Sequence, residues 1–432
     1  MKPLVAAFAL TFAAPIFTGS VFAAQGAHPF DVHDLVMMDR VSDPALSPDG
    51  KVVAFQVRET DYDANKGTNG VWIVPSGGGK STRLTDKALN ATSPRWATDG
   101  SVYFLAPKDG ISQLWRVGAN GGAAQAATSL PLDVNNFKFS PDGKRVLLSV
   151  DVFTDCGDLA CTKKKLDERK ANKASGTVYD TIFIRHWDTW ADGTRSQLFV
   201  VPLSKQNGDS TPLVGKLIGD TPSKPFGGGE EVAWSADGRT VFFALREAGR
   251  IEPTSTNLDI FSVPADGSAQ PTNLTPDNDG TDNLPTVSPD GKWLAWVSMK
   301  RPGYEADRLV LQLRNLATGE TRAVTEAWDR SVDSIAWTPD SKKIIVCAGD
   351  TQEVPAFEVD PKNGKVTRLT QEGAVSAVVP VKGGMVYAMN SLLSPDDFYL
   401  LKGKTSTRLT SVNAAKMAGI DLPKVERFSF TA

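Results

Sequence analysis

One stretch near the N-terminus has the residue types of a phosphate-binding loop. The sequence VPSGGGKSTRLTD, residues 74–86, puts three glycines, a lysine and two hydroxyl residues directly after an apolar run. A P-loop has the pattern GxxxxGK[ST], because its first glycine lets backbone N–H groups wrap around the phosphates. Counting back from Gly79 and Lys80, that glycine should stand at position 74, which is Val74. We therefore expect this stretch to form a turn and to bind no nucleotide.

Residues for metal or nucleophilic chemistry are not grouped in this chain. The three histidines, His28, His33 and His186, share no ligand spacing with the cysteines. The acidic loop at 276–283 resembles a calcium loop, but its glycine is the fourth residue from Asp277 and not the sixth. The GxSxG pattern of α/β-hydrolase nucleophiles does not occur. The sequence therefore predicts no metal site, no cofactor and no catalytic residue in this chain.

The glycine-rich stretch is one copy of a repeat, and a second signature is interleaved with it. Each copy of the glycine-rich signature follows a short apolar run. The copies lie at 77–85, 267–275, 318–325, 363–370 and 402–410, with degenerate versions at 122–128 and 208–214. The second signature, SPDG followed by alternating apolar residues, has its fourth position at 50, 100, 143, 238, 291, 341 and 384. Proline and glycine at these places are typical of tight turns, and the alternation is typical of half-buried strands. Each unit is thus predicted to contain four strands, with an SPDG turn after the first and a glycine-rich turn after the third.

The spacing of the turns predicts the fold. It is near the 40 to 50 residues expected of a four-stranded propeller blade. One interval is double, and because both signatures occur seven times we assign the excess to a partly helical insertion in the third blade, at about 153–190. The sequence therefore predicts an all-β protein, a seven-bladed β-propeller of four-stranded antiparallel blades at 41–412. Four tryptophans are expected to pack between blades: Trp96, Trp234, Trp296 and Trp337.

The composition fits a globular domain and argues against a nucleic-acid partner. The chain of 432 residues is 41% hydrophobic and 22% charged, with a formal net charge of −3. No basic stripe occurs beyond KKKLDERK at 163–170, which we expect to be the solvated face of a short helix.

The first residues predict export. Residues 1–23 contain a lysine, an apolar core and small residues before a cut after Ala23, which is the pattern of a secretory signal peptide. Residues 24–40 are expected to form a short N-terminal helical segment, and no later run approaches the roughly 20 apolar residues that span a bilayer. We therefore expect a secreted or periplasmic protein with no membrane span.

An oxidising compartment permits disulfides. Cys156 and Cys161 stand five residues apart in the predicted insertion, and we expect them to pair. Cys347 lies in an apolar run and is expected to be reduced and buried.

Several segments resemble the N-terminal region of secreted bacterial enzymes of the prolyl oligopeptidase family. They are HPFDVHDLVMMDRVSDPALSPDGKVVAFQV at 28–57, RHWDTWADGTRSQLFVVPL at 185–203 and LPKVERFSFTA at 422–432, together with the run of SPDG turns. The dipeptidyl-peptidase V and acylaminoacyl-peptidase branch is the most similar in pattern.

The resemblance implies a serine exopeptidase in two parts. An α/β-hydrolase domain would carry the Ser, Asp and His triad, and the propeller would cover it, gate entry and recognise peptides. Residues 413–432 would then be a linker toward that domain, and this chain alone would have no peptidase activity. A standalone TolB-like periplasmic propeller that binds protein partners is the alternative, and a propeller enzyme using its own central channel is a third. The resemblance leaves the oligomeric state open, including a homo-oligomer.

The resemblance also suggests residues that would contact substrate. An exopeptidase recognises a charged N-terminal amine, and carboxylates are the natural partners of an ammonium group. An arginine could orient a carbonyl or pair with one of these acids, and tryptophans could wall an apolar pocket. The candidates are Glu230, Glu231 and Asp188 for the amine, Arg185 for the carbonyl, and Trp187 and Trp190 for the pocket. The alternative is that the charged residues are solvated or locally paired and the tryptophans belong to the inter-blade core.

Overall fold

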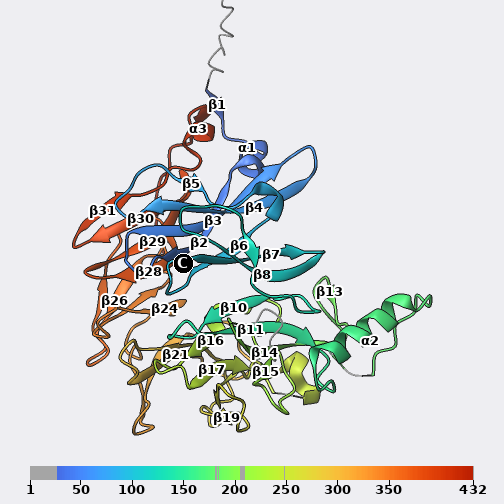
Figure 1. Ribbon diagram of the computed structural model, residues 1–432. Coiled ribbons are helices and arrows are strands. Elements are labelled where there is room, and N and C mark those ends of the chain that lie inside the picture. The colour runs from blue at the N-terminus through green and yellow to red at the C-terminus, as the bar shows by residue number, and fades with distance from the viewer. Residues whose placement is uncertain (1–26, 181, 183, 205–209, 248, 432) are drawn as a thin grey trace, which may run out of the picture.

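Seven four-stranded antiparallel sheets form a ring (Figure 1). The computed structural model describes residues 27–431 except 181, 183, 205–209 and 248. The predicted signal peptide at 1–23 lies outside these residues. The predicted seven-bladed β-propeller is confirmed, and the first strand of each blade lies nearest the centre of the ring.

The first four blades occupy the N-terminal part of the chain. Blade 1 contains β2 (Arg40–Leu46), β3 (Val52–Asp61), β4 (Lys66–Pro75) and β5 (Thr82–Arg83). Blade 2 contains β6 (Thr92–Trp96), β7 (Val102–Lys108), β8 (Ile111–Val117) and β9 (Gln125–Ala126). Blade 3 contains β10 (Asn136–Phe139), β11 (Arg145–Val152), β14 (Arg195–Pro202) and β15 (Thr211–Pro212). Blade 4 contains β16 (Val232–Trp234), β17 (Thr240–Leu245), β18 (Asp259–Pro264) and β19 (Thr272–Asn273).

The other three blades follow the same order. Blade 5 contains β20 (Asp282–Val287), β21 (Trp293–Ser298), β22 (Val310–Asn315) and β23 (Thr321–Ala323). Blade 6 contains β24 (Ser334–Trp337), β25 (Ile344–Cys347), β26 (Ala356–Val359) and β27 (Val366–Arg368). Blade 7 contains β28 (Ala374–Val381), β29 (Gly384–Ser391), β30 (Ser394–Lys402) and β31 (Thr405–Arg408). Three 3-10 turns join elements: η1 (Lys87–Leu89), η2 (Gly229–Glu231) and η3 (Gly249–Thr254).

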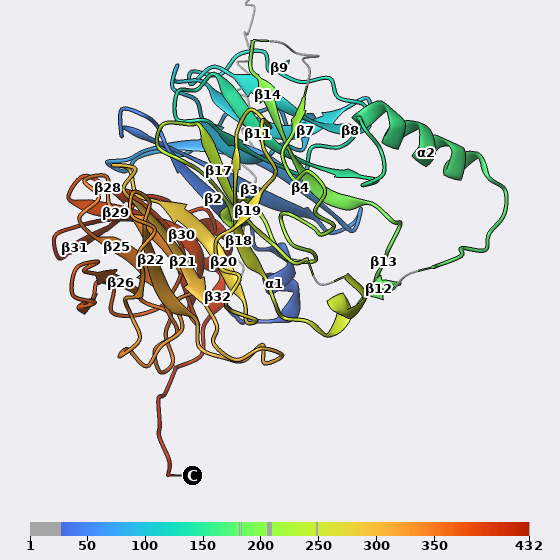
Figure 2. The same cartoon turned by 90° about the horizontal axis from the view of Figure 1, so that it is seen from below.

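The alternation of strand directions gives the ring two different faces. The SPDG turns and the glycine-rich turns join the first to the second and the third to the fourth strand, so both lie on one face, which we call the turn face. The other connections, within blades and between blades, lie on the opposite face, which we call the loop face. Helix α1 (Val32–Met37) leads into the loop-face end of β2, and the C-terminal residues leave the ring on the same side (Figure 2).

A hydrogen bond between a hydroxyl and a carboxylate holds the SPDG turn in five of the seven blades. In five blades the Ser or Thr hydroxyl donates to the Asp two residues later, at 2.5 to 2.7 Å. The pairs are Ser47 and Asp49, Ser140 and Asp142, Ser235 and Asp237, Ser288 and Asp290, and Thr338 and Asp340. The following position has a positive φ, for example +73° at Gly50 and +59° at Ser341, a conformation that glycine adopts without strain. The predicted turn chemistry is therefore confirmed.

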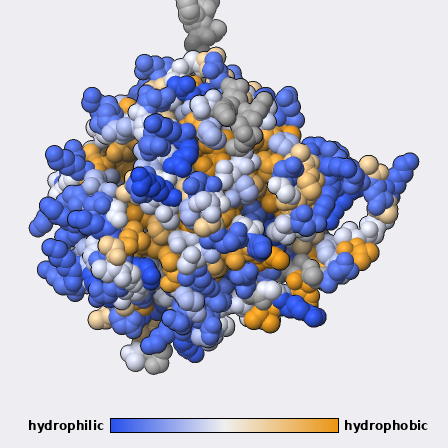
Figure 3. Space-filling model, turned by 60° about the horizontal axis from the view of Figure 1, so that its bottom comes forward, coloured by the Kyte–Doolittle hydropathy of each residue, from blue (hydrophilic) through white to orange (hydrophobic). Residues whose placement is uncertain are grey.

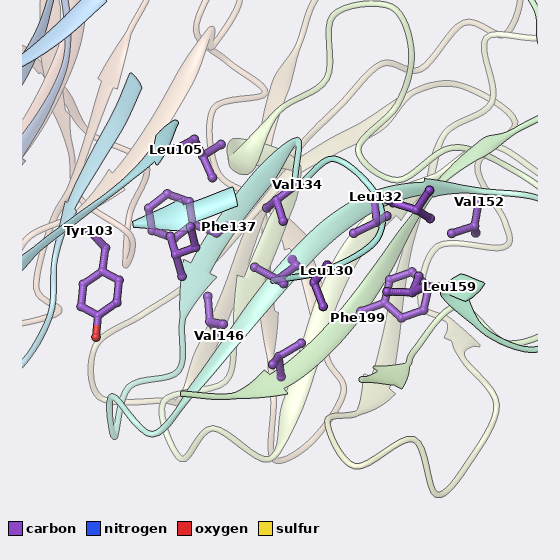
Figure 4. Packing of buried hydrophobic residues seen from close by; sticks show 14 of the residues in the cluster. Tyr103, Leu105, Leu130, Leu132, Val134, Phe137, Val146, Val152, Leu159 and Phe199 are labelled. Atoms are coloured by element: carbon purple, nitrogen blue, oxygen red, sulfur yellow. The ribbon is translucent and has the colours of Figure 1, made fainter. Parts of the chain in front are cut away.

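The core consists of apolar clusters between neighbouring blades. The Nε1 atoms of Trp96, Trp234 and Trp337 donate to backbone carbonyls of the preceding blade, at 3.0, 3.1 and 3.3 Å. Trp296 packs in a cluster with Phe242 of blade 4. All four tryptophans thus lie between blades, as predicted. Figure 4 shows one such cluster between blades 2 and 3.

The ring closes without exchange of strands between its ends. Blade 1 comes wholly from the first strands and blade 7 wholly from the last ones. Their interface contains Phe55 and Phe398, whose ring centroids are 5.1 Å apart. On the loop face, β1 (His28–Pro29) pairs in parallel with β32 (Ile420–Asp421), close to α3 (Ala414–Met417).

The insertion projects from blade 3 between β11 and β14. It contains α2 (Leu159–Ala171) and the hairpin of β12 (Arg185–His186) and β13 (Thr189–Trp190). Leu159 packs on the blade 3 cluster (Figure 4), whereas the rest of the helix is largely hydrophilic (Figure 3). A disulfide joins Cys156 to Cys161, and Cys347 is a buried free cysteine. Among the described residues, no helix is long and apolar enough to cross a membrane.

Candidate functional site on the loop face

Exposed apolar side chains are concentrated on one face of the ring. Among the described residues, the large apolar side chains that remain exposed lie in loop-face connections or in terminal segments attached to that face. They are Phe30, Val32, Leu35, Tyr62, Val178, Ile182, Ile184, Trp187, Trp190, Ile218, Phe226, Ile251, Tyr304, Leu392, Leu393, Val425, Phe428 and Phe430. Contiguous exposed apolar surface usually marks a place of interaction. The loop face is therefore where we look for a functional site.

Glu231 is a buried carboxylate at the loop-face end of blade 4. It ends η2, and only 3% of the residue is exposed. Its Oε2 accepts a hydrogen bond from Ser223 N at 2.6 Å, and its Oε1 accepts from Ser223 Oγ at 2.8 Å and from Asn283 Nδ2 at 2.7 Å. Burial raises the pKa of Glu231 above its usual value. All three donors are uncharged, so the described contacts give this carboxylate no positive partner.

Glu230 adds a second negative charge beside Glu231. It is exposed, and its charge raises the pKa of Glu231 further. Two adjacent carboxylates, one held by the scaffold and one open to solvent, can together bind a cation such as an ammonium group.

Lys138, on the first strand of blade 3, contacts the backbone of the turn that carries these two acids. Its Nζ donates to the carbonyls of Gly229 at 3.1 Å and Val232 at 2.6 Å, on either side of the glutamate pair. Burial lowers the pKa of Lys138 to about 8, and the Arg95 cation lowers it as well, while Glu230 raises it. Lys138 therefore fixes the turn that carries the two acids.

Lys138 was not among the site residues predicted from the sequence, although a signal was present. Lys138 stands five residues before the turn glycine of its blade, and Arg95 has the same place in blade 2. Blades 4, 5 and 6 have Ala233, Thr286 and Ala336 there. A cation at a position where blades 4, 5 and 6 have a small residue could have been recognised as a departure from the repeat.

The remaining predicted residues lie in the insertion hairpin and are exposed. The ring of Trp187 meets that of Phe226 edge to face, with centroids 4.9 Å apart, and this links the hairpin to the connection that leads to η2. The Arg185 guanidinium lies over the Trp190 ring at 5.4 Å, so it stacks on the indole. Asp188 accepts only a 3.3 Å hydrogen bond from Thr189 Oγ1. Contacts within the described residues do not join Asp188 to Glu230 or Glu231, and Trp187 and Trp190 do not belong to the inter-blade core.

A second network that the sequence analysis missed fixes the same connection. Arg195 donates to Asp220 Oδ2 at 2.8 Å and to the two carboxylate oxygens of Glu252, each at 2.7 Å. These hydrogen bonds raise the pKa of Arg195 above its usual value. The network holds the connection before blade 4 against η3, and it depends on residues 25 and 57 positions apart in the sequence.

Comparisons with known proteins identify relatives of this architecture. Residues 24–155 match the family described as Lipoprotein LpqB beta-propeller domain. Dipeptidyl-peptidase 5 of Porphyromonas gingivalis is 33% identical over 393 residues, which are 89% of this chain and 55% of the relative. The chain thus spans about half the length of the curated relatives it matches.

Solved structures share the fold at low sequence identity. A structure described as acylaminoacyl peptidase in complex with Z-Gly-Gly-Phe-chloromethyl ketone superposes with a TM-score of 0.68 at 14% identity, covering 91% of this chain and 56% of that one. The β-propeller domain of the Trilobed protease from Pyrococcus furiosus, described as having an open velcro topology, gives 0.58 at 14% identity, with coverages of 87% and 99%. This chain is therefore homologous to dipeptidyl-peptidase 5 proteins over about half of their length, and it has the β-propeller fold found in acylaminoacyl peptidases.

Proposed function

We propose that this chain is the substrate-gating and recognition propeller of an exported serine exopeptidase of the dipeptidyl or acylaminoacyl type. In this proposal, the part of the relatives that the chain does not span provides an α/β-hydrolase domain that covers the loop face. The exposed apolar side chains on that face support the proposal, because they would become buried against such a domain. The Arg427 side chain pairs with Glu353 on the loop face, which directs the C-terminal segment across blade 6.

The observation that carries the recognition role is the Glu230 and Glu231 pair. A buried carboxylate without a positive partner is costly, and an ammonium group of a ligand would offset that cost. A peptide N-terminus supplies such a group. Lys138 and Ser223 hold the pair in place, so little reorganisation would be needed on binding.

The residues then have separate roles in peptide hydrolysis. Glu230 and Glu231 bind the substrate ammonium and so set the distance from the N-terminus to the scissile bond. Trp187 and Phe226 provide apolar surface for a side chain near that end. The nucleophile, its base and the oxyanion donors would come from the hydrolase domain.

Peptide binding to this chain tests the proposal directly. Titration calorimetry with Ala-Ala-Ala and with its N-acetylated form should show tighter binding of the free amine. Glu231→Gln should remove this preference, whereas Glu372→Gln, which changes an exposed acid on the loop face between blades 6 and 7, should keep it. Equal affinity of the native chain for both peptides would contradict amine recognition, and would instead favour a standalone propeller that binds protein partners through its apolar loop face.

A further inference from the structure

A second candidate site lies at the loop-face ends of blades 3, 4 and 5. Loops from these three consecutive blades line an open cavity of about 470 Å³. His186 of the insertion hairpin lines it from blade 3, Arg246 and residues 253–256 line it from blade 4, and residues 303–306 line it from blade 5. We call this space the Arg246 cavity.

Arg246 brings an unpaired cation to this cavity. It directly follows β17, and its backbone packs closely on the preceding connection, because a Cβ on Gly219 would lie 2.3 Å from the Arg246 carbonyl oxygen. The Nε of its guanidinium is buried and has no hydrogen-bond partner among the described residues. A buried donor without a partner is rare in folded proteins, and it often indicates a ligand or water at that place.

Arg195, one blade away, shows how such a residue is satisfied when its role is structural. Its guanidinium forms ion pairs with Asp220 and Glu252 at 2.8 and 2.7 Å. Arg246 forms no ion pair within the described part of the chain, even though Glu305 also lines the cavity. The scaffold thus holds Arg246 in place and leaves its charge available to an anion.

Two hydroxyl groups of the same cavity are free to donate. Ser255 Oγ accepts a hydrogen bond from Asn257 N at 3.2 Å, and Thr256 Oγ1 accepts one from Gly303 N at 2.8 Å. Each hydroxyl therefore retains its own hydrogen for a ligand. One guanidinium with two hydroxyl donors suits a singly charged, planar anion, which a guanidinium can bind in bidentate fashion.

The surrounding charges favour a carboxylate over a phosphate. Arg301 stacks at 4.1 Å over the ring of Tyr304, which lines the cavity, and Glu305 lines the cavity with a negative charge. Asp307, which follows the lining residue Ala306, accepts hydrogen bonds from the N–H groups of Lys300 and Arg301 and offsets the Arg301 charge. The cavity therefore has little net charge, and Glu305 would repel a dianion more strongly than a monoanion. A carboxylate is thus the anion that this cavity accommodates best.

We infer that the Arg246 cavity binds a carboxylate group of a peptide, either its C-terminal carboxylate or the side chain of an acidic residue. The inference rests on the proposed function in that it takes peptides as the molecules that reach the loop face. Its ligand group differs from the amine bound at Glu230 and Glu231, so the two sites can fail independently.

Calorimetry with three peptides separates the sources of the carboxylate. Ala-Ala-Ala has a C-terminal carboxylate, Ala-Ala-Glu-amide has only the side-chain one, and Ala-Ala-Ala-amide has none. We expect at least one carboxylate peptide to bind the native chain about tenfold more tightly than Ala-Ala-Ala-amide, and which one it is identifies the source. Equal affinity for all three peptides would overturn the inference, whatever N-acetylation does.

Variants test whether Arg246 carries this preference. Arg246→Met should abolish it and Arg246→Lys should keep part of it, because lysine retains the charge but lacks the planar fork. Arg250→Met changes an exposed arginine on the same loop and should have no effect. Preserved discrimination in Arg246→Met would overturn the assignment.

Thermal unfolding gives an independent readout that does not use peptides. Since Arg246 has an unsatisfied buried donor, Arg246→Met should leave the unfolding midpoint unchanged or raise it. Arg195→Met, which breaks a satisfied network, should lower it. A large fall for Arg246→Met would show that the residue has a structural role and would contradict the inference.

Discussion

The two faces of this propeller differ in how their polar groups are satisfied. On the turn face, the same short-range hydrogen bond between a hydroxyl and an aspartate recurs from blade to blade. On the loop face, the clusters around the candidate site occur once and join residues from different blades, as with Glu231, Ser223 and Asn283. Repetition therefore maintains the ring, and the departures from it gather where we propose ligands bind.

Buried carboxylates of the loop face titrate in the opposite direction from the aspartates of the turns. The pKa of Asp237 in a turn is lowered, chiefly because the Ser235 hydroxyl donates to it. Burial instead raises the pKa values of Glu231, Asp259 and Asp282 at the loop-face ends of strands. The turns thus stabilise ionised acids locally, as the loop face does for Asp350 beside two arginines, whereas burial disfavours the ionised form of the three acids just named, and a bound cation would favour it.

The largest effect is expected when the loop-face site is altered in an enzyme that joins this propeller to a hydrolase domain. Glu231→Gln should lower kcat/KM for a dipeptidyl reporter with a free N-terminus, because a desolvated charge pair with the substrate is lost. The fall should correspond to a loss of about 2 to 5 kcal/mol of transition-state stabilisation. Glu230→Gln and Asp188→Asn should be compared in the same assay. Hydrolysis of a small activated ester, which needs only the triad, should be unchanged.

Two results would contradict this expectation. Native discrimination in all three variants would mean that recognition lies outside these acids. Peptide cleavage by the propeller chain alone would contradict the proposal that catalysis belongs to the hydrolase domain.

The next effect concerns the insertion, which lies outside the four-stranded blades and lacks their packing. Helix α2 buries only Leu159 and Thr162, so we expect the Cys156 to Cys161 disulfide to stabilise it. Replacing both cysteines by serine should lower stability by about 2 kcal/mol on the chain-entropy account. Thiol counting on the denatured, unsubstituted protein should find one free thiol, Cys347. A count of three would show that the disulfide does not form.

The sequence predicted the turn face better than the loop face for a physical reason. A Ser235 to Asp237 bond spans two residues, so the motif contains everything that determines it. The Arg195 to Glu252 contact spans 57 residues, and no local pattern specifies it. Glu230 and Glu231 could be placed before a strand, but the burial of only the second one depends on Ser223 and Asn283. Trp187 and Trp190 could have been core or pocket residues, and only their place in a projecting hairpin shows that they are exposed.

A smaller effect is expected from the pKa of a turn aspartate, which is lowered where that of Glu231 is raised. Ser235→Ala should lower stability by about 1 kcal/mol near pH 7, since the hydroxyl also accepts from the N–H groups of Arg239 and Thr240. The lowered pKa of Asp237 contributes stability that is present above its unfolded value near 3.8 and is lost as pH falls through the folded value. The difference between native and Ser235→Ala protein should therefore shrink below about pH 4.

Glu231 should behave with the opposite sign. Its folded pKa is raised above the usual 4.5, so the folded state takes up a proton first and gains stability relative to the unfolded state as pH falls toward 4.5. Glu231→Gln should lack this gain. Unfolding midpoints of the native protein, Ser235→Ala and Glu231→Gln should be measured from pH 3 to 7. If the midpoints of both variants change with pH in the same way relative to the native protein, Asp237 and Glu231 do not titrate in opposite directions.

The smallest effect is expected at Lys80 on the turn face. The GGGKST stretch forms the turn between β4 and β5, with Gly78 and Gly79 at φ +89° and +141°. It leads into a strand and not into the N-terminus of a helix that could bind phosphate. The equivalent position is a lysine in blade 6, Lys365, but it is Glu320 in blade 5 and Thr405 in blade 7, so the ring does not depend on a positive charge there. Lys80→Ala should change stability by less than about 0.5 kcal/mol, as exposed turn substitutions usually do. ATP should show no saturable binding to the native chain; saturable binding that disappears in Lys80→Ala would give the turn face a ligand and end its description as a purely structural surface.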